Sequence, residues 1–176
     1  MALTIHLSES DVSWCRELGI RRSDSVGHAS TRNSQNFFEG SEPWYRHFIG
    51  VLGEKAYSAY SGYPVDDQTI GRGDSGVDFP GGVQVKTACL ESKPRLMIPQ
   101  SQYDRKMCEY YVLAWVRSGD YSSVVILGRI TRSHFDDIKE SATFYVPTYF
   151  CMAKSLEPLE SQESFRFAEA PRSFSY

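Results

Sequence analysis

The residues from Val77 to Lys86 alternate apolar and polar side chains on both sides of a Pro-Gly-Gly sequence at positions 80–82. Alternation with a period of two residues is the pattern of a half-buried strand, and a glycine-rich break between two such runs is typical of a β-hairpin. This stretch constrains the fold strongly, because the length of the turn decides which side chains share a face of the hairpin.

With a turn of three residues, Asp78 lies opposite Gln84, and Lys86 follows on the same face two positions later. The other face then carries the apolar side chains Val77, Phe79, Val83 and Val85. A carboxylate, an amide oxygen and an ammonium group on one face can hold a divalent metal ion and its water. A turn one residue shorter would move Asp78 to the opposite face, so this prediction depends on the register.

Two helices are predicted before the hairpin. Ser8 and Asp11 form a capping sequence for a first helix that ends at about Gly19, and residues 23–40 are rich in polar residues and predict a long surface loop. A second helix is predicted from about Glu42 to Tyr60, because apolar residues recur there at helical spacing and a Gly-x-Pro sequence follows.

Gly50 and Gly53 are unusual inside the second helix, because each costs about 1 kcal/mol relative to alanine. Such glycines are explained where the backbone of a helix must approach another element closely. Glu54 lies one turn after Gly50 and off the apolar stripe, so its carboxylate is predicted to project over that close approach. An exposed helix residue paired with its neighbours is the structural alternative for Glu54.

The second half of the chain predicts further strands and helices. Tyr110 to Val116 is almost continuously apolar, as expected for a strand covered on both faces. The remaining predicted elements are a short helix between Pro99 and Cys108, a strand at Ser123–Ile130, a helix from Thr131 or Ser133 to about Glu140, and a strand at Thr143–Tyr149. Together they predict an α/β fold with a mixed central β-sheet flanked by helices. We expect a single domain over residues 1–176 with its core at about 41–150; for residues 155–176 a docked tail and a disordered one both remain open.

Composition limits the classes of function. The chain has 176 residues, a hydrophobic content of 41% and a net charge of −3, which is typical of a folded globule and gives no general sign of nucleic-acid binding. The scattered cysteines indicate buried free thiols in a reducing compartment, and no apolar run suits a membrane span or a secretory signal, so a cytoplasmic location without membrane contact is expected. A local basic strip that can contact a phosphate backbone, or else form a solvated loop, consists of Lys93, Arg95, Arg105 and Lys106.

Three short motifs together resemble the PD-(D/E)XK nuclease superfamily in its small phage or bacterial form. They are Gly50-Val51-Leu52-Gly53-Glu54 in a helix, Val77-Asp78-Phe79, and Val83-Gln84-Val85-Lys86, and the resemblance covers about residues 41–130. The resemblance implies a restriction-endonuclease-like core and Mg²⁺-dependent hydrolysis of DNA phosphodiester bonds, with Mn²⁺ as a substitute for Mg²⁺.

The resemblance also implies a role for each matching residue. Asp78 becomes the primary metal ligand, Glu54 reaches the metal directly or through water, and Lys86 orients or activates the attacking water. Gln84 stands at the position of the second acidic ligand, where its amide oxygen and the Val85 carbonyl can add to an oxygen ligand set of the kind that Mg²⁺ prefers. Because Gln84 is uncharged, we expect a lower metal affinity than with an acidic residue.

Two other interpretations of the sequence remain open. Gln84 favours a catalytically weak or inactive protein of the same fold that binds nucleic acid or a protein partner. In an unrelated α/β interaction protein, the candidate residues would not converge around one pocket. Asp74 is either an auxiliary metal ligand or a turn residue, His28 is a candidate for substrate contact, and a homodimer is compatible with cutting both strands of DNA.

Overall fold

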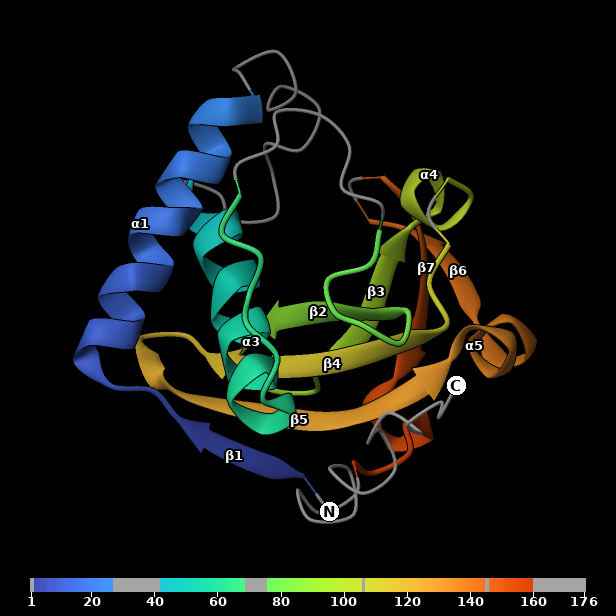
Figure 1. Cartoon of the computed structure of the whole chain (residues 1–176). Helices are drawn as coiled ribbons and strands as arrows, with labels where there is room; N and C mark the ends of the chain where they lie inside the picture. The colour runs from blue at the N-terminus through green and yellow to red at the C-terminus, as the bar shows by residue number, and fades with distance from the viewer. Residues whose placement is uncertain (1, 27–41, 69–75, 106, 145, 160–176) are drawn as a thin grey trace, which may run out of the picture.

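The computed structural model describes residues 2–26, 42–68, 76–105, 107–144 and 146–159, which form two β-sheets and a helical layer (Figure 1). Along the chain the elements are β1 (Leu3–His6), α1 (Glu9–Val26), α3 (Tyr45–Ser61), β2 (Val83–Cys89), β3 (Arg95–Pro99), α4 (Gln100–Tyr103), β4 (Tyr110–Arg117), β5 (Asp120–Thr131), α5 (Arg132–Ile138), β6 (Glu140–Thr143), β7 (Pro147–Met152) and the 3₁₀ helix η1 (Ala153–Ser155).

The first sheet is mixed and the second is antiparallel. The strand order of the first sheet is β1-β5-β4-β2, and β2 and β4 are its parallel pair. The second sheet has the order β3-β7-β6. In Figure 1, α1 and α3 lie on one side of the molecule and the second sheet on the other, with β2, β4 and β5 between them. The predicted α/β class and mixed sheet are confirmed, whereas the second sheet was not predicted.

Two hydrophobic cores lie on the two faces of the first sheet. Alternate residues of β4 belong to different cores: Val112 and Ala114 pack with α1 and α3, while Tyr111 and Leu113 pack with β3, α4 and α5. All four side chains are at most 1% exposed. The prediction of a strand at 110–116 that is covered on both faces is therefore confirmed.

The first helix begins as predicted and ends later. Ser8 Oγ accepts a hydrogen bond from the Asp11 N–H at 3.1 Å, and Asp11 Oδ2 accepts one from the Ser8 N–H at 3.1 Å, so the capping sequence is formed. The helix then continues through Gly19 to Val26, and residues 23–26 of the predicted loop are helical. This correction matters because it places Arg22 on a helix.

Other boundaries also differ from the prediction. The second helix starts at Tyr45 and ends at Ser61, where Gly62 adopts a left-handed φ of 81°. The predicted strand at 143–149 is wrong, because residues 140–143 and 147–152 form two antiparallel strands. β1 and β3 are short, and each is fixed by pairing with a strand far away in the sequence, namely β5 and β7.

The prediction of a close approach at the helix glycines is confirmed for Gly53. A Cβ atom built on Gly53 would lie 2.0 Å from Thr87 Oγ1 on β2 and 3.0 Å from Ala114 Cβ on β4. A Cβ atom on Gly50 would meet no atom of the described residues within 4 Å, although the Gly50 carbonyl accepts a 3.4 Å hydrogen bond from Thr87 Oγ1. Gly53 therefore sets the distance between α3 and the first sheet.

We expect Gly53→Ala to lower the free energy of unfolding by about 1–3 kcal/mol, because the added methyl group overpacks the contact between α3 and the sheet. Gly50→Ala is the matched control in the same helix, where alanine is expected to be neutral or to stabilise by up to about 1 kcal/mol. Urea unfolding of both variants measures the difference. Equal stability of the two variants would contradict the close contact at Gly53.

Candidate functional site

The turn between Phe79 and Val83 has the predicted length. Phe79 and Val83 form an antiparallel bridge, so Pro80, Gly81 and Gly82 are the three residues of the loop. Gly81 and Gly82 have φ values of 79° and 71°, which residues other than glycine rarely adopt. The Gly82 carbonyl also accepts hydrogen bonds from the backbone N–H groups of residues 109 and 110, which joins the turn to the start of β4.

The first arm of the predicted hairpin is not a strand beyond that single bridge. Phe79, Val83 and Val85 belong to the core beside α3, as predicted for one face. Val77 packs against the other core, so its predicted place beside Phe79 is wrong. The backbone departs from regular pairing at this point because the Val83 carbonyl accepts from the N–H groups of both residues 78 and 79, at 2.8 and 3.1 Å.

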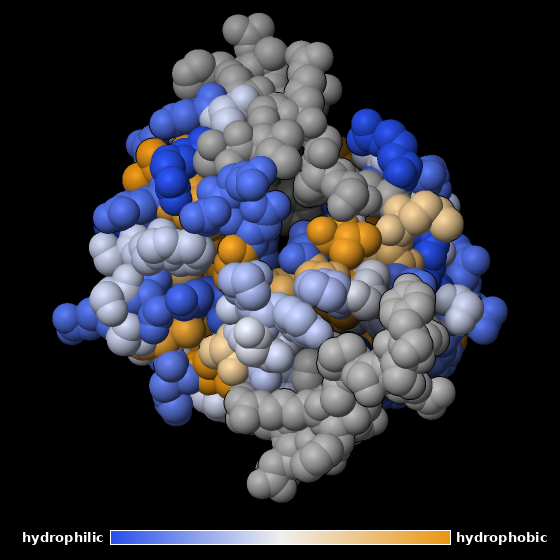
Figure 2. All heavy atoms as spheres, in the orientation of Figure 1, coloured by the Kyte–Doolittle hydropathy of each residue, from blue (hydrophilic) through white to orange (hydrophobic). Residues whose placement is uncertain are grey.

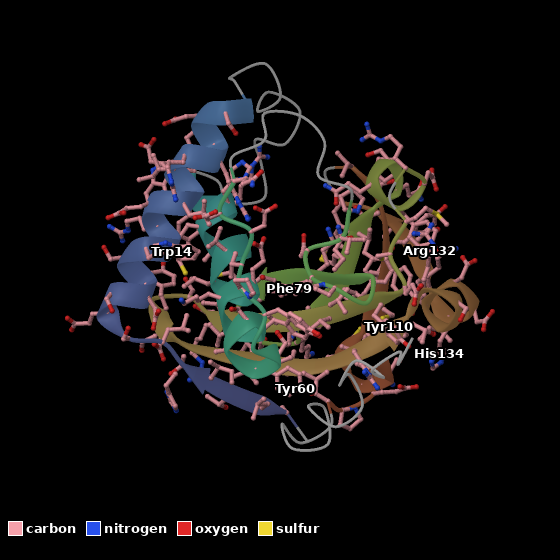
Figure 3. All side chains as sticks on the ribbon, in the orientation of Figure 1. Trp14, Tyr60, Phe79, Tyr110, Arg132 and His134 are labelled. Atoms are coloured by element: carbon pink, nitrogen blue, oxygen red, sulfur yellow. The ribbon has the colours of Figure 1, made fainter. Side chains whose placement is uncertain are left out.

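Asp78 is fixed against β2 by two backbone hydrogen bonds. Its N–H donates to the Val83 carbonyl at 2.8 Å, and its Oδ2 accepts from the Val85 N–H at 2.7 Å. The next residue anchors the turn, because the Phe79 ring is 2% exposed and its centroid lies 4.9 Å from that of Tyr57 on α3. Figure 3 shows Phe79 in the middle of the molecule. The carboxylate of Asp78 therefore lies next to the strand that carries Gln84 and Lys86.

Gln84 and Lys86 lie on the face of β2 opposite to α3. Their neighbours Val83 and Val85 pack into the core beside α3, and side chains alternate along a strand. Gln84 is only 3% exposed and is paired in register with Tyr111 of the second core. Lys86 Nζ donates a 3.1 Å hydrogen bond to Gln102 Oε1 on α4. The alternation predicted for these two residues is thus present, and the Gln84 side chain is buried.

Glu54 is held by Arg22 of α1. Arg22 donates from Nη1 to Glu54 Oε1 at 2.8 Å and from Nη2 to Glu54 Oε2 at 2.9 Å, a two-pronged ion pair. Nη2 also donates to the Asp66 carbonyl at 2.8 Å. The side chains of Arg22 and Glu54 are 23% and 13% exposed, so the pair is largely sheltered from water.

The charge of Asp78 reaches the same guanidinium. Burial acts to lower the pKa of Arg22, but the hydrogen bonds to Glu54 and the negative charges of Glu54, Asp78 and Asp66 together raise it above its ordinary value. Glu54 therefore contacts the Arg22 guanidinium directly, and Asp78 is near enough to act on its charge. Figure 2 shows a recess in the middle of this face of the molecule, with hydrophilic residues on its border toward α1 and α3.

The predicted basic strip is divided between separate places. Lys93 is exposed in the connection before β3 and has a φ of 53°, and Arg95 starts β3 with its guanidinium 5.7 Å from the centroid of Phe150. Arg105 follows α4, beyond the other end of β3, and donates from Nε to the Ser101 carbonyl at 2.7 Å. Lys106, Asp74 and His28 lie outside the described residues, as does most of the predicted loop at 23–40.

The donors at the candidate site are oxygen atoms, which is the ligand chemistry that Mg²⁺ prefers. They are the carboxylates of Asp78 and Glu54, the amide oxygen of Gln84 and the Val85 carbonyl. Within the described ranges, no three His, Cys, Asp or Glu side chains are grouped closely enough to hold a metal ion. The types of donor atom suit Mg²⁺, and water would have to complete the coordination.

Two further observations bear on the choice of site. A pocket of about 480 Å³ lined by residues that include Leu7, Arg16 and Tyr121 contains none of the candidate residues. It lies toward the N-terminal end of α1, whereas Arg22 lies toward the C-terminal end.

All four cysteines are buried and free, as predicted.

Comparison with family models, with curated proteins and with solved structures finds no match to this chain. In the part of the chain that the structure describes, no helix is long and apolar enough to cross a membrane.

Sequence reasoning did not identify Arg22 and His47 as parts of this region. His47 lies two turns before Glu54 on α3, and its Nε2 is buried without a hydrogen-bond partner among the described residues. Burial and the charges of Arg46 and Arg22 lower the pKa of His47 to about 4. The only sequence signal for Arg22 was its position just past the predicted end of the first helix.

We expect the protein to lose stability as the pH falls from 6.5 to 4, partly through His47. The unfolded chain binds a proton on His47 below pH 6.5, whereas the folded chain does so only near pH 4, so protonation favours the unfolded state within that window. Urea unfolding at pH 7 and pH 5 measures the loss, which we expect to be about 1 kcal/mol smaller in His47→Gln. The exposed His134 on α5 provides the control His134→Gln, and an equal pH dependence in both variants would contradict the role of His47.

Proposed function

We propose that this protein is a metal-dependent nuclease that hydrolyses DNA phosphodiester bonds on a restriction-endonuclease-like core. The observation that carries the proposal is that Asp78 is hydrogen-bonded to the strand that carries Gln84 and Lys86, while its charge acts on Arg22, the residue that binds Glu54. The motif residues come from a helix, a turn and a strand. Asp78 links the two groups, because it is hydrogen-bonded to the strand of Gln84 and Lys86 and its charge acts on the partner of Glu54.

Each residue has a task in this proposal. Asp78 is held in place by the Val85 N–H and would bind the cation, with the Gln84 amide and the Val85 carbonyl as neutral oxygen donors. A bound Mg²⁺ would supply positive charge to neutralise the phosphoryl oxygens and lower the pKa of a water. Lys86 positions the attacking water through its ammonium group, which Gln102 holds toward α4.

A specific observation favours a second candidate function, a nuclease-fold protein that binds nucleic acid or a protein partner with weak or no catalysis. Gln84 takes the place of an acidic ligand and is 3% exposed. The site therefore offers two carboxylates where an acidic residue at position 84 would offer a third. The two candidates differ in whether metal-dependent cleavage occurs, because DNA binding alone needs neither Asp78 nor Lys86 as a reacting group.

We expect the protein to cleave supercoiled or linear DNA in Mg²⁺ or Mn²⁺ and to lose cleavage in EDTA. Asp78→Asn keeps an oxygen that can accept from the Val85 N–H but removes the charge, and we expect at least about 100-fold lower activity. Lys86→Met removes the ammonium group and should reduce cleavage to a similar extent.

The matched control for Lys86→Met is Lys154→Met, at an exposed lysine in η1. Thermal unfolding checks that each variant is folded. If the wild type and both site variants show the same residual cleavage, the nuclease proposal is wrong. Retained DNA binding without cleavage in the wild type would support the second candidate instead.

Gln84→Glu tests whether the amide is a metal ligand. If it is, we expect the added charge to tighten Mn²⁺ binding by about tenfold while cleavage is kept or increased, because a carboxylate neutralises a divalent cation better than an amide does. Isothermal titration of Mn²⁺ in the absence of DNA measures the affinity. An unchanged titration curve would argue against ligation by residue 84.

A further inference from the structure

The two long helices run antiparallel, as three cross-helix contacts show: Asp11 with Lys55, Cys15 with the Val51 carbonyl, and Gly19 with the backbone of Phe48. In any helix the Cα–Cβ bonds tilt toward the N-terminus. On two antiparallel helices, side chains that both lie C-terminal to a contact therefore lean back toward it, as Arg22 and Glu54 do from the contact of Gly19 with Phe48. Arg22 and Glu54 meet in this way across the helix pair.

The contact engages both oxygens of Glu54. Nη1 and Nη2 of Arg22 lie 2.8 and 2.9 Å from Oε1 and Oε2, respectively. A divalent cation that approached the same oxygens would be repelled by the guanidinium, and the repulsion is weakly screened because both side chains are mostly buried. In this geometry, Glu54 already has its counter-ion.

Arg22 makes a further contact besides the ion pair with Glu54. The Asp66 carbonyl accepts from Nη2 at 2.8 Å, and the negative charge of Asp78 adds to the attraction. Arg22 thus binds the helix carboxylate directly and lies within electrostatic range of the turn carboxylate.

We propose that Arg22 is a built-in competitor of the divalent cation for Glu54, so that this carboxylate becomes a metal ligand only when the Arg22–Glu54 ion pair opens. The inference deepens the proposed function and rests on it for the identity of the metal site. It assigns to Arg22 a control of metal loading, separate from any effect of Gln84.

The chain contains a matched control for this ion pair. Lys55 Nζ and Asp11 Oδ1 form a second salt bridge between α1 and α3, 3.0 Å long. Lys55 is the residue next to Glu54, and its pair joins the same two helices through Asp11 in place of Glu54. Removing the Lys55 charge therefore tests the effect of losing a cation between these helices without breaking the contact to Glu54.

The test is titration of the DNA-free protein with Mn²⁺, followed by electron paramagnetic resonance of free Mn²⁺ and by calorimetry. We expect Arg22→Gln to bind Mn²⁺ about three- to thirtyfold more tightly than the wild type, since a charge-assisted contact to Glu54 no longer has to break. Arg22→Lys, which replaces two donating nitrogens with one, should give an intermediate affinity. Lys55→Gln should match the wild type within twofold.

A double variant isolates the role of Glu54. In a Glu54→Gln background the carboxylate is absent, so adding Arg22→Gln should tighten Mn²⁺ binding clearly less than it does with Glu54 present, because only the repulsion by the guanidinium is removed. An equal gain in both backgrounds would contradict the competition for Glu54. Circular dichroism and the unfolding temperature establish which variants are folded, and Arg22→Lys carries the test if Arg22→Gln does not fold.

The outcomes separate this inference from the proposed function. If the wild type binds Mn²⁺ through Asp78, as shown by loss of binding in Asp78→Asn, but Arg22→Gln and Arg22→Lys bind with unchanged or weaker affinity, the competition is refuted and the nuclease proposal stands. If neither the wild type nor any Arg22 variant binds Mn²⁺ at millimolar concentration, the metal site itself is refuted. Tighter binding in Arg22→Gln, and not in Lys55→Gln, supports the competition.

Discussion

The close approach of α3 to the first sheet is the contact on which the candidate site depends. Gly53 allows it, because any larger residue would place a Cβ atom 2.0 Å from Thr87 Oγ1. Gly19 allows a similar approach of α1 to α3, where a Cβ atom would lie 2.7 Å from the backbone nitrogen of Phe48. These glycines bring the three layers close enough for Arg22 of α1, Glu54 of α3 and Asp78 beside β2 to act on one another.

Local turn chemistry supplies the other half of the arrangement. The positive φ angles of Gly81 and Gly82 reverse the chain within three residues, and Phe79 locks the reversed chain against α3. Asp78 can then accept from the Val85 N–H. The position of this carboxylate follows from one aromatic anchor and two glycines, and it does not require a full strand on the first arm of the turn.

Several of these features could be predicted from the sequence because their causes are local. The capping pair Ser8 and Asp11, the glycine that ends α3 and the length of the turn before Val83 all depend on residues a few positions apart. The close contact of Gly53 was also predicted, because a glycine inside a helix is unfavourable unless a neighbour requires it.

The features that the sequence did not predict arise from contacts between distant residues. The end of α1 lies in the polar sequence after Gly19, where helical periodicity is weak and packing against α3 decides the structure. β3 is fixed by pairing with β7, whose paired residues lie 49 to 57 positions away. Arg22 and Glu54 are separated by 32 positions, and nothing near either residue in the sequence identifies its partner.

The ion pair between Arg22 and Glu54 and the neutral residue at position 84 both reduce the uncompensated charge inside the fold. A site with several buried carboxylates and no cation is destabilised by mutual repulsion and by the loss of hydration. Here Arg22 compensates Glu54, and Gln84, which is 3% exposed beside the second core, adds no charge that would need a partner. A glutamate at position 84 would be costly to bury in the absence of metal. The Arg22 ion pair and the Gln84 amide therefore act in the same direction: both keep the fold from depending on a cation, and in the nuclease that we propose both would lower the affinity for that cation.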